Sequence, residues 1–165
     1  MDAASRASGE SAARACRELA SRVRHGALAT ASSSSEAPGF PFATLVAIAF
    51  DARGRPLMLL SRLAEHTKNL EACERASLLV TEPAADPLAA GRMTLVGTCA
   101  RVPGEECEDA RAAFLAAHPE AARYAGFSDF GYWRLEVASV RWVGGFGRME
   151  WVDGAAYGAA VVAQP

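Results

Sequence analysis

The feature that most restricts how this chain folds is a series of short β-strand patterns along its length. Residues 42–50 alternate between two faces, turn formers follow at 51–54, and residues 56–61 return as the second strand of a hairpin. Further strands are predicted at 26–31, 76–82, 92–102, 132–143 and 146–152. Helix-length crossovers do not alternate regularly with these strands, so we expect an antiparallel barrel rather than a doubly wound parallel sheet.

Helical patterns are inserted between some of these strands. The apolar stripe over residues 10–25 predicts an amphipathic helix, and further helices are predicted at 63–74, 105–117 and 120–124. A length of 165 residues fits one domain. The predicted fold is therefore mainly β with helical inserts, an α+β class, in a single domain whose residues 1–10 and 153–165 are loose tails.

The positions of two residues within these elements allow more specific structural predictions. Gly97 lies in the middle of a strand, which predicts a β-bulge or a close approach of another backbone. His25 follows the first helix pattern, where its partial positive charge would be favourable at the helix C-terminus.

Composition and charge argue against several classes of protein. Seventeen basic and nineteen acidic side chains give a formal net charge of -2, which disfavours a nucleic-acid binder. The longest apolar stretch, residues 42–50, is too short to cross a bilayer, and residues 1–10 do not resemble a secretory signal. We therefore expect a cytoplasmic protein without a membrane span. The four cysteines form no CxxC pair and the three histidines lack zinc-ligand spacing, so we expect buried reduced thiols and no metal site.

Familiar catalytic and nucleotide-binding motifs are missing. Gly144, Gly145 and Gly147 lack the third glycine of the dinucleotide-binding GxGxxG pattern, so a corner between two strands is the expected role. The sequence also contains no P-loop, no GxSxG elbow and no HExxH motif.

The most informative segment for function is residues 61–70, which joins a strand to the start of a helix. Arg62, His66 and Lys68 are basic side chains at a helix end that already carries positive partial charge, so an anion would relieve the conflict. The hydroxyl groups of Ser61 and Thr67 add donors that suit a phosphate. The alternative is a solvated helix face with ion pairs between Arg62 and Glu65 and between Lys68 and Glu71.

Several short motifs, taken in order, resemble a known family. They are residues 26–30 (GALAT), 41–46 (PFATLV), 60–61 (LS) with 66–70 (HTKNL), 92–97 (RMTLVG) and 144–148 (GGFGR). Together they run from about residue 17 to residue 152 and resemble the pyridoxamine 5′-phosphate oxidase-like FMN-binding split-barrel family, with the haem-utilisation (HugZ-type) branch most similar.

This resemblance implies a split β-barrel homodimer that binds FMN at the interface between its subunits. By this resemblance, the flavin ring would be lined by Thr44, Leu45 and Val46. The flavin phosphate would be held by Ser61, Arg62, His66 and Lys68, beside Asn69. Arg92 would approach the flavin from the partner subunit, and Arg148 would face the same cleft. Aromatic residues near the end of the chain, Trp133, Trp142 and Trp151, are expected in the core or at the dimer interface.

The function that the resemblance implies is an FMN-dependent oxidoreductase acting on a small molecule, with HugZ-like haem degradation as one such reaction. The alternative is a flavin- or haem-binding protein without catalysis, and a weaker alternative is a pyridoxamine 5′-phosphate oxidase. Of the Arg-Leu-x-x-Arg signature of those oxidases the chain keeps only Arg148, which disfavours that reaction. No histidine follows His118, so haem ligation by a C-terminal histidine is not expected.

Overall fold

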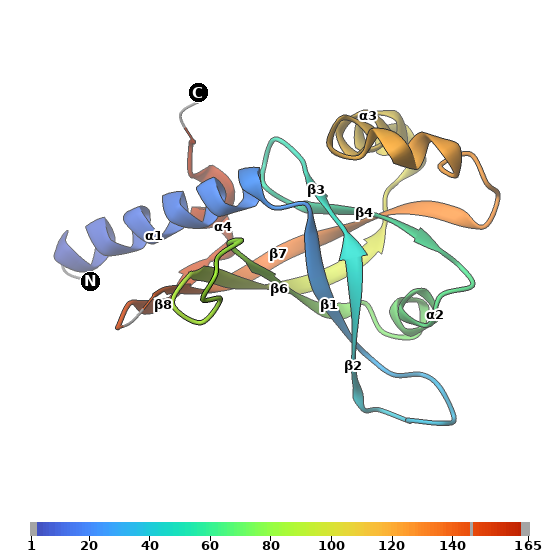
Figure 1. Ribbon diagram of the computed structural model, residues 1–165, viewed down its shortest axis with the longest axis horizontal. Helices are drawn as coiled ribbons and strands as arrows, with labels where there is room; N and C mark the ends of the chain where they lie inside the picture. Colours follow the sequence, from blue (N-terminus) through green and yellow to red (C-terminus); the bar gives the residue numbers. More distant parts are fainter. Residues whose placement is uncertain (1–2, 146, 163–165) are drawn as a thin grey trace.

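The computed structural model describes residues 3–145 and 147–162, and its centre is one curled antiparallel sheet (Figure 1). The strand order is β2-β1-β5-β6-β7-β4-β3, with β8 paired to β7. The strands are β1 (His25–Ala31), β2 (Pro41–Ala47), β3 (Ala49–Phe50), β4 (Pro56–Ser61), β5 (Arg75–Thr81), β6 (Gly91–Arg101), β7 (Phe130–Gly144) and β8 (Met149–Asp153). The expected α+β split barrel is confirmed.

Helical elements cover parts of both faces of this sheet. They are α1 (Ala3–Arg22), α2 (Glu65–Ala72), η1 (Gly104–Glu106), α3 (Cys107–Ala117), η2 (Pro119–Arg123) and α4 (Gly154–Ala159). Helices α1 and α4 contact each other and the β7–β8 part of the sheet, α2 contacts β1, and α3 lies over β3 and β4. Within the described residues, none of these helices has the length and apolar character needed to cross a bilayer.

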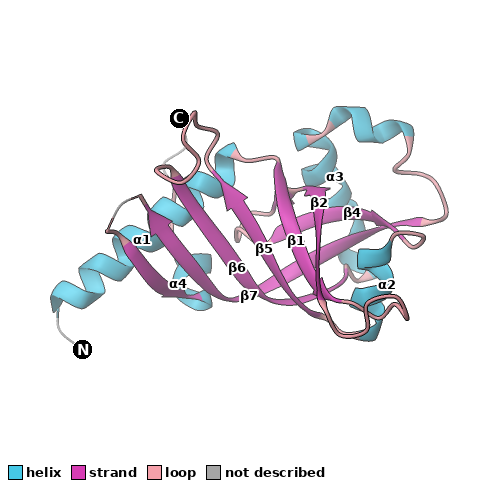
Figure 2. Cartoon of the chain, turned by 60° about the horizontal axis from the view of Figure 1, so that its bottom comes forward, coloured by secondary structure: helices cyan, strands magenta, loops and turns pink. Residues whose placement is uncertain are grey.

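Two hydrophobic clusters lie on opposite faces of the sheet because the side chains of β4 alternate. Met58 and Leu60 point into the main core, which α1 closes with Cys16, Leu19 and Ala20. Leu57 and Leu59 point the other way and pack under α3 with Phe114 and Tyr132. Because α3 covers only this part of the outer face, no helix among residues 3–145 and 147–162 lies over β1, β5 and the first half of β6 on that side (Figure 2).

The strand expected over residues 42–50 is divided in two. Ile48 falls between β2 and β3, and its N–H donates to the carbonyl of Arg24 at 2.8 Å rather than to a neighbouring strand. Gly97 does form the expected irregularity, since the β6–β7 register shifts between Val96 and Gly97. A side chain at Gly97 would collide with the carbonyl oxygen of Glu136 across the ladder.

Within the described residues, both segments that were expected to be loose tails contain a helix. Helix α1 begins at Ala3 instead of residue 10. Beyond residue 153 the chain forms α4, where Asp153 caps the helix and Tyr157 is 1% exposed. The Tyr157 hydroxyl donates to the carbonyl of Gly54 at 2.7 Å, so one buried aromatic residue holds this segment in place. Residue 146, where the last strand was expected to begin, and residues 163–165 lie outside the described residues.

Candidate functional site

The first candidate site is the start of helix α2, directly after β4. Ala64 occupies the N-cap position and provides no side-chain hydrogen bond to the first turn. Arg62, just before the helix, is exposed and has no ion-pair partner among the described residues. An uncapped helix start next to a cation is an arrangement that can accept an anion.

Two carboxylates compete for the other polar groups at this helix start. The Ser61 hydroxyl donates to Asp129 at 2.6 Å. The Lys68 ammonium lies 3.5 Å from Glu65. Lys68 therefore pairs with Glu65 and not with Glu71, the partner expected for a solvated helix face. A phosphate at this position would therefore face two negative charges as well as the basic side chains.

His66 and Asn69 connect α2 to the β1–β2 hairpin. His66 Nδ1 lies 3.1 Å from the Thr44 hydroxyl, and burial lowers the pKa of the imidazole, which favours its neutral form. Asn69 is fully buried, accepts from the backbone N–H of Ser33 at 2.8 Å and donates to the Thr30 hydroxyl at 3.0 Å. Both ends of the Asn69 amide are thus used within the protein.

The three residues expected to line a flavin ring from β2 do not share one face. Thr44 is half-buried against His66, and Val46 is buried in the main core. Leu45 points to the outer face and is 78% exposed. A ligand on either side of β2 therefore contacts only part of the expected set.

Arg92 and Arg148 lie together, but far from α2. Gly91 pairs with Gly144 at this end of the sheet, and the Gly144 N–H donates to the carbonyl of Arg148. On β5, the partner of Arg92 is five residues beyond the partner of Thr30, a distance of about 17 Å along the strand. One chain does not bring the predicted site residues together, so a shared site requires a second copy.

A second candidate site lies on the uncovered outer face of the sheet. Ala27 on β1 pairs with Leu45 on one side and with Leu79 on the other, so the three side chains form one row. The row is part of a groove of about 480 Å³ that is also lined by Arg22 at the end of α1, by Arg24 and by His25, the first residue of β1. We define this groove by those six residues and call it the β1 groove. The sequence signal for it is the alternation of His25 and Ala27 on one strand face; His25 was expected only at a helix end, and Ala27 in the strand predicted at 26–31.

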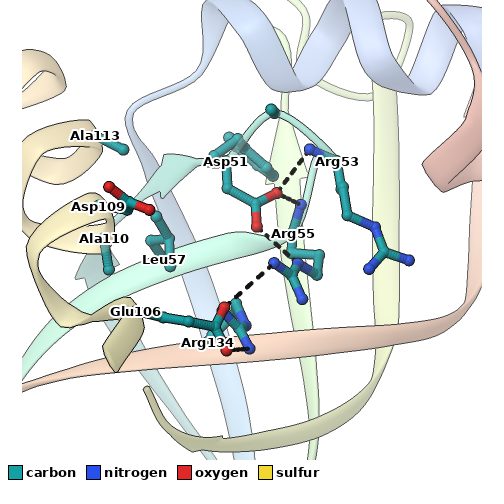
Figure 3. Close-up of a pocket in the computed structure, with 11 residues that line it drawn as sticks. Asp51, Arg53, Arg55, Leu57, Glu106, Asp109, Ala110, Ala113 and Arg134 are labelled. Atoms are coloured by element: carbon teal, nitrogen blue, oxygen red, sulfur yellow. Dashed lines mark hydrogen bonds and ion pairs between the residues drawn. The ribbon is translucent and has the colours of Figure 1, made fainter. Parts of the chain in front are cut away.

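A third cleft, of about 450 Å³, is lined by charged residues beneath α3 (Figure 3). Arg55 contacts Asp51 at 2.6 Å and Glu136 at 2.9 Å, while Arg134 contacts Glu136 at 2.7 Å and also Glu106. The hydrogen bond from Arg134 holds the pKa of Glu106 below its usual range. The two arginines are saturated by carboxylates, so this cluster joins η1 to the sheet rather than offering charge to a ligand.

Comparison with known proteins places this geometry in a family. Residues 7–159 match the family model described as CREG, beta-barrel, which is most of the chain. The chain belongs to the CREG β-barrel family. Solved structures of similar fold include Campylobacter jejuni ChuZ, with a TM-score of 0.72 at 18% identity over 84% of this chain and 58% of that chain. The expected resemblance to the pyridoxamine 5′-phosphate oxidase-like split barrels, including the HugZ-type branch, is confirmed at the level of the fold.

Two relatives of this CREG-family chain share more sequence. A structure titled heme binding protein from Mycobacterium smegmatis is 43% identical, with a TM-score of 0.83, over 90% of this chain and 60% of that one. The Arabidopsis thaliana protein named non-canonical heme oxygenase HOZ, chloroplastic, is 38% identical over 120 residues, which is 73% of this chain and 36% of that protein. The chain therefore spans between about a third and three fifths of the length of these relatives.

Proposed function

We propose that this CREG-family protein binds haem as a homodimer and degrades it in a haem oxygenase-type reaction. The observation that carries this proposal is the 43% identity to a heme binding protein across 90% of the chain. The 38% identity to a heme oxygenase supports the activity.

The chemistry of the two candidate sites supports haem over a phosphate ligand. Haem is a flat apolar ring with two carboxylates, and it needs an apolar surface beside cationic groups. The β1 groove combines Leu45 and Leu79 with Arg22 and Arg24. At α2, by contrast, Glu65 and Asp129 offset much of the positive charge that a flavin phosphate would use.

The uncovered sheet face supports a homodimer. The row through Leu45, Ala27 and Leu79 continues through Thr94 on β6 and Arg141 on β7 to Trp151 on β8. Trp151 is 63% exposed, and the Arg141 guanidinium lies over its ring. The exposed apolar side chains of this row, Leu45, Leu79 and Trp151, are of the kind found on surfaces that a partner covers. A second copy on this face would also bring cations such as Arg92 and Arg148 from another chain toward the candidate sites.

The test is a titration of the purified protein with hemin, followed by turnover. We expect a saturable shift of the Soret band with one hemin per protomer. Addition of ascorbate under air, where O₂ is the oxidant and ascorbate supplies electrons, should then convert the bound haem to a linear tetrapyrrole and release iron. Catalase is included so that free peroxide does not bleach the haem. No Soret shift would overturn the proposal, and binding without tetrapyrrole formation would remove the catalytic part.

A second candidate function is FMN-dependent oxidoreduction, which the uncapped start of α2 beside Arg62 favours. If α2 holds the flavin phosphate, the protein should bind FMN more tightly than riboflavin, and Arg62→Gln should remove that difference. Equal or absent binding of the two flavins would exclude this candidate. Because only Arg148 of the expected arginine pair is present, we expect no oxidation of pyridoxamine 5′-phosphate.

A further inference from the structure

We propose that Cys107 is a site of reversible oxidation, at which the Tyr132 hydroxyl and the Arg111 guanidinium hold the oxygen of a sulfenate. The three residues lie at the start of α3, which packs over β4 and β7 (Figure 1). They belong neither to the start of α2 nor to the β1 groove, so this site is independent of the proposed haem binding. Three features support it: an accessible thiol, a buried hydroxyl donor without an acceptor, and a nearby cation.

Two of the four cysteines can be reached by a small oxidant, since Cys107 and Cys73 are half-buried. Cys16 and Cys99 are buried in the main core, and burial raises the pKa of each thiol to about 12. Neither of these two forms a thiolate at neutral pH. The backbone N–H and the side chain of Arg75 hold the pKa of Cys73 below its usual range. Cys73 therefore provides an internal reference for the reactivity of Cys107.

The position of Cys107 in α3 suits a negatively charged sulfur. Cys107 is the first residue of the helix, and Glu106 before it provides no side-chain cap. Free N–H groups at the start of a helix stabilise an anion there. The Glu106 carboxylate pairs with Arg134 instead of approaching the thiol. The other acidic side chains nearby are exposed, so water screens their charge: Glu105, Glu108 and Asp109.

The hydroxyl of Tyr132 is a buried donor without an acceptor. Tyr132 is 7% exposed, and its hydroxyl has no hydrogen-bond partner among the described residues. Cys107 packs against the hydrophobic cluster that contains this tyrosine. Burial raises the pKa of the Tyr132 hydroxyl, Arg111 lowers it and Cys107 raises it again, so both side chains lie close to the phenol. Because buried hydroxyls normally have partners, an oxygen on the Cys107 sulfur would supply the missing acceptor.

Arg111 adds the positive charge that a sulfenate needs. It follows Cys107 by one helical turn, so the two side chains lie on the same face of α3. Arg111 is exposed and forms no ion pair within the described part of the chain. A guanidinium only donates hydrogen bonds, so it cannot accept the proton of the Tyr132 hydroxyl. Both groups can, however, donate to one sulfenate oxygen, which is a far stronger acceptor than a thiol sulfur.

The oxidant in the proposed step is hydrogen peroxide. The Cys107 thiolate attacks one peroxide oxygen, the S–O bond forms as the O–O bond breaks, and hydroxide leaves and takes up a proton to become water. The sulfur loses two electrons and the peroxide gains them. A dithiol such as dithiothreitol reverses the step: its first thiol displaces the oxygen as water, and its second thiol then releases Cys107 as the dithiol becomes a disulfide.

The test is peroxide treatment of the reduced, ligand-free protein in the presence of dimedone, which reacts with sulfenic acids. Mass spectrometry of the digested protein measures the label on each cysteine. We expect label on Cys107 and none on the buried Cys16 and Cys99. Dithiothreitol added before dimedone should abolish the label on Cys107. The label on Cys73 in the same sample corrects for the dose of peroxide.

Two variants test the roles of the neighbouring side chains. Tyr132→Phe and Arg111→Gln should each lower the ratio of label on Cys107 to label on Cys73 about 10-fold, because each removes a hydrogen bond to a charged oxygen. Tyr124→Phe, which removes a hydroxyl from another tyrosine packed against this cluster, is the matched control and should keep the wild-type ratio.

The outcome does not depend on haem binding. An unlabelled Cys107 in the wild type, or an unchanged ratio in either variant, would overturn the proposal whether or not the protein binds hemin. Arg111 is exposed, so Arg111→Gln gives a result even if the loss of the buried hydroxyl unfolds the other variant. Circular dichroism of each variant checks that the fold is retained.

Discussion

Asn69 shows how one buried side chain fixes the relation between a helix and a loop. Its amide oxygen accepts from both the N–H and the hydroxyl of Ser33, and its amide nitrogen donates to Thr30. Residues 32–40 connect β1 to β2, and the N–H of Ser32 donates to the carbonyl of Phe40 to close them. The position of this loop beside α2 therefore depends on a single amide group.

Replacing this amide should destabilise the protein. Asn69→Leu keeps the approximate volume but leaves the partners at Ser33 and Thr30 without their hydrogen bonds, so the free energy of unfolding should fall by about 1–3 kcal/mol. Urea unfolding followed by tryptophan fluorescence measures the change. Ser33→Ala is the matched control, because its backbone N–H still donates to Asn69, and it should lose less than about 1 kcal/mol. Equal losses in the two variants would contradict this role.

At residue scale, sequence reasoning found the right segment but not the contacts within it. The basic side chains of residues 61–70 predicted an anion site, and the helix start does lack a cap. The pattern contained no information on Asp129, which is 68 residues away and takes the Ser61 hydroxyl. The burial of Asn69 and the Thr44 contact of His66 are likewise set by tertiary packing.

Among the elements, η1 is attached to the sheet by charge rather than by apolar packing. None of its residues is buried, and Glu106 reaches Arg134 on β7. The same arginine contacts Glu136, which in turn contacts Arg55 near β4 (Figure 3). The attachment therefore depends on the ionisation of Glu106.

This attachment should weaken at low pH. The pKa of Glu106 is lowered from 4.5 in the folded protein, so its contribution is present above that value and is lost as pH falls through the lower, folded-state pKa. Glu106→Gln should reduce the thermal midpoint at pH 7, and the difference from wild type should shrink as the pH falls below 4.5. Melting curves across this range measure it. The exposed neighbour Glu105 provides the control, since Glu105→Gln should follow the wild type at every pH.

Helix α4 shows why the C-terminal element was missed. Residues 154–159 (GAAYGA) contain two glycines and no periodic apolar stripe, so local propensity does not favour a helix. The helix is held by the burial of Tyr157 and by Asp153, which accepts from the N–H groups of Ala155 and Ala156. Asp153 before the helix is the local signal that the sequence offered, because aspartate is a common N-cap residue. The burial of Tyr157 against distant residues could not be predicted from the local sequence.

For the whole molecule, the main consequence of the fold is the contrast between its two faces. The inner face is filled by the main core and closed by α1 and α4, whereas the outer face over β1 and β5 is open (Figure 2). This contrast predicts where a charge should disturb assembly.

Leu79→Glu should convert the expected dimer to a monomer. An unpaired carboxylate buried in an interface costs about 3 kcal/mol, and a symmetric dimer buries two of them, so the dimer Kd should rise roughly 10⁴-fold. Sedimentation velocity over a concentration series measures this change. Val161, which is 78% exposed beyond α4, provides the control, and Val161→Glu should sediment like the wild type. A wild-type monomer at micromolar concentration would contradict the dimer itself.

The strands were easier to predict than their arrangement. Alternation over residues 92–102 and the hairpin at 51–61 depend on neighbouring residues, and β6 and β4 lie where expected. The pairing of β5 with β1 and of β4 with β7 joins strands that are far apart in the sequence. Local sequence patterns carry no information on such pairings. For this part the likeness to a split-barrel family was needed.

The packing of α1 against α4 has a practical consequence for measuring the protein. Apart from Arg22 at the end of α1, which lines the β1 groove, both helices lie on the other side of the sheet. A sensor surface or a fluorescent label coupled through exposed positions on either helix therefore leaves the groove facing the solution. Porphyrin binding and self-association become measurable on the same immobilised molecule, with flow of hemin in one channel and of free protein in the next.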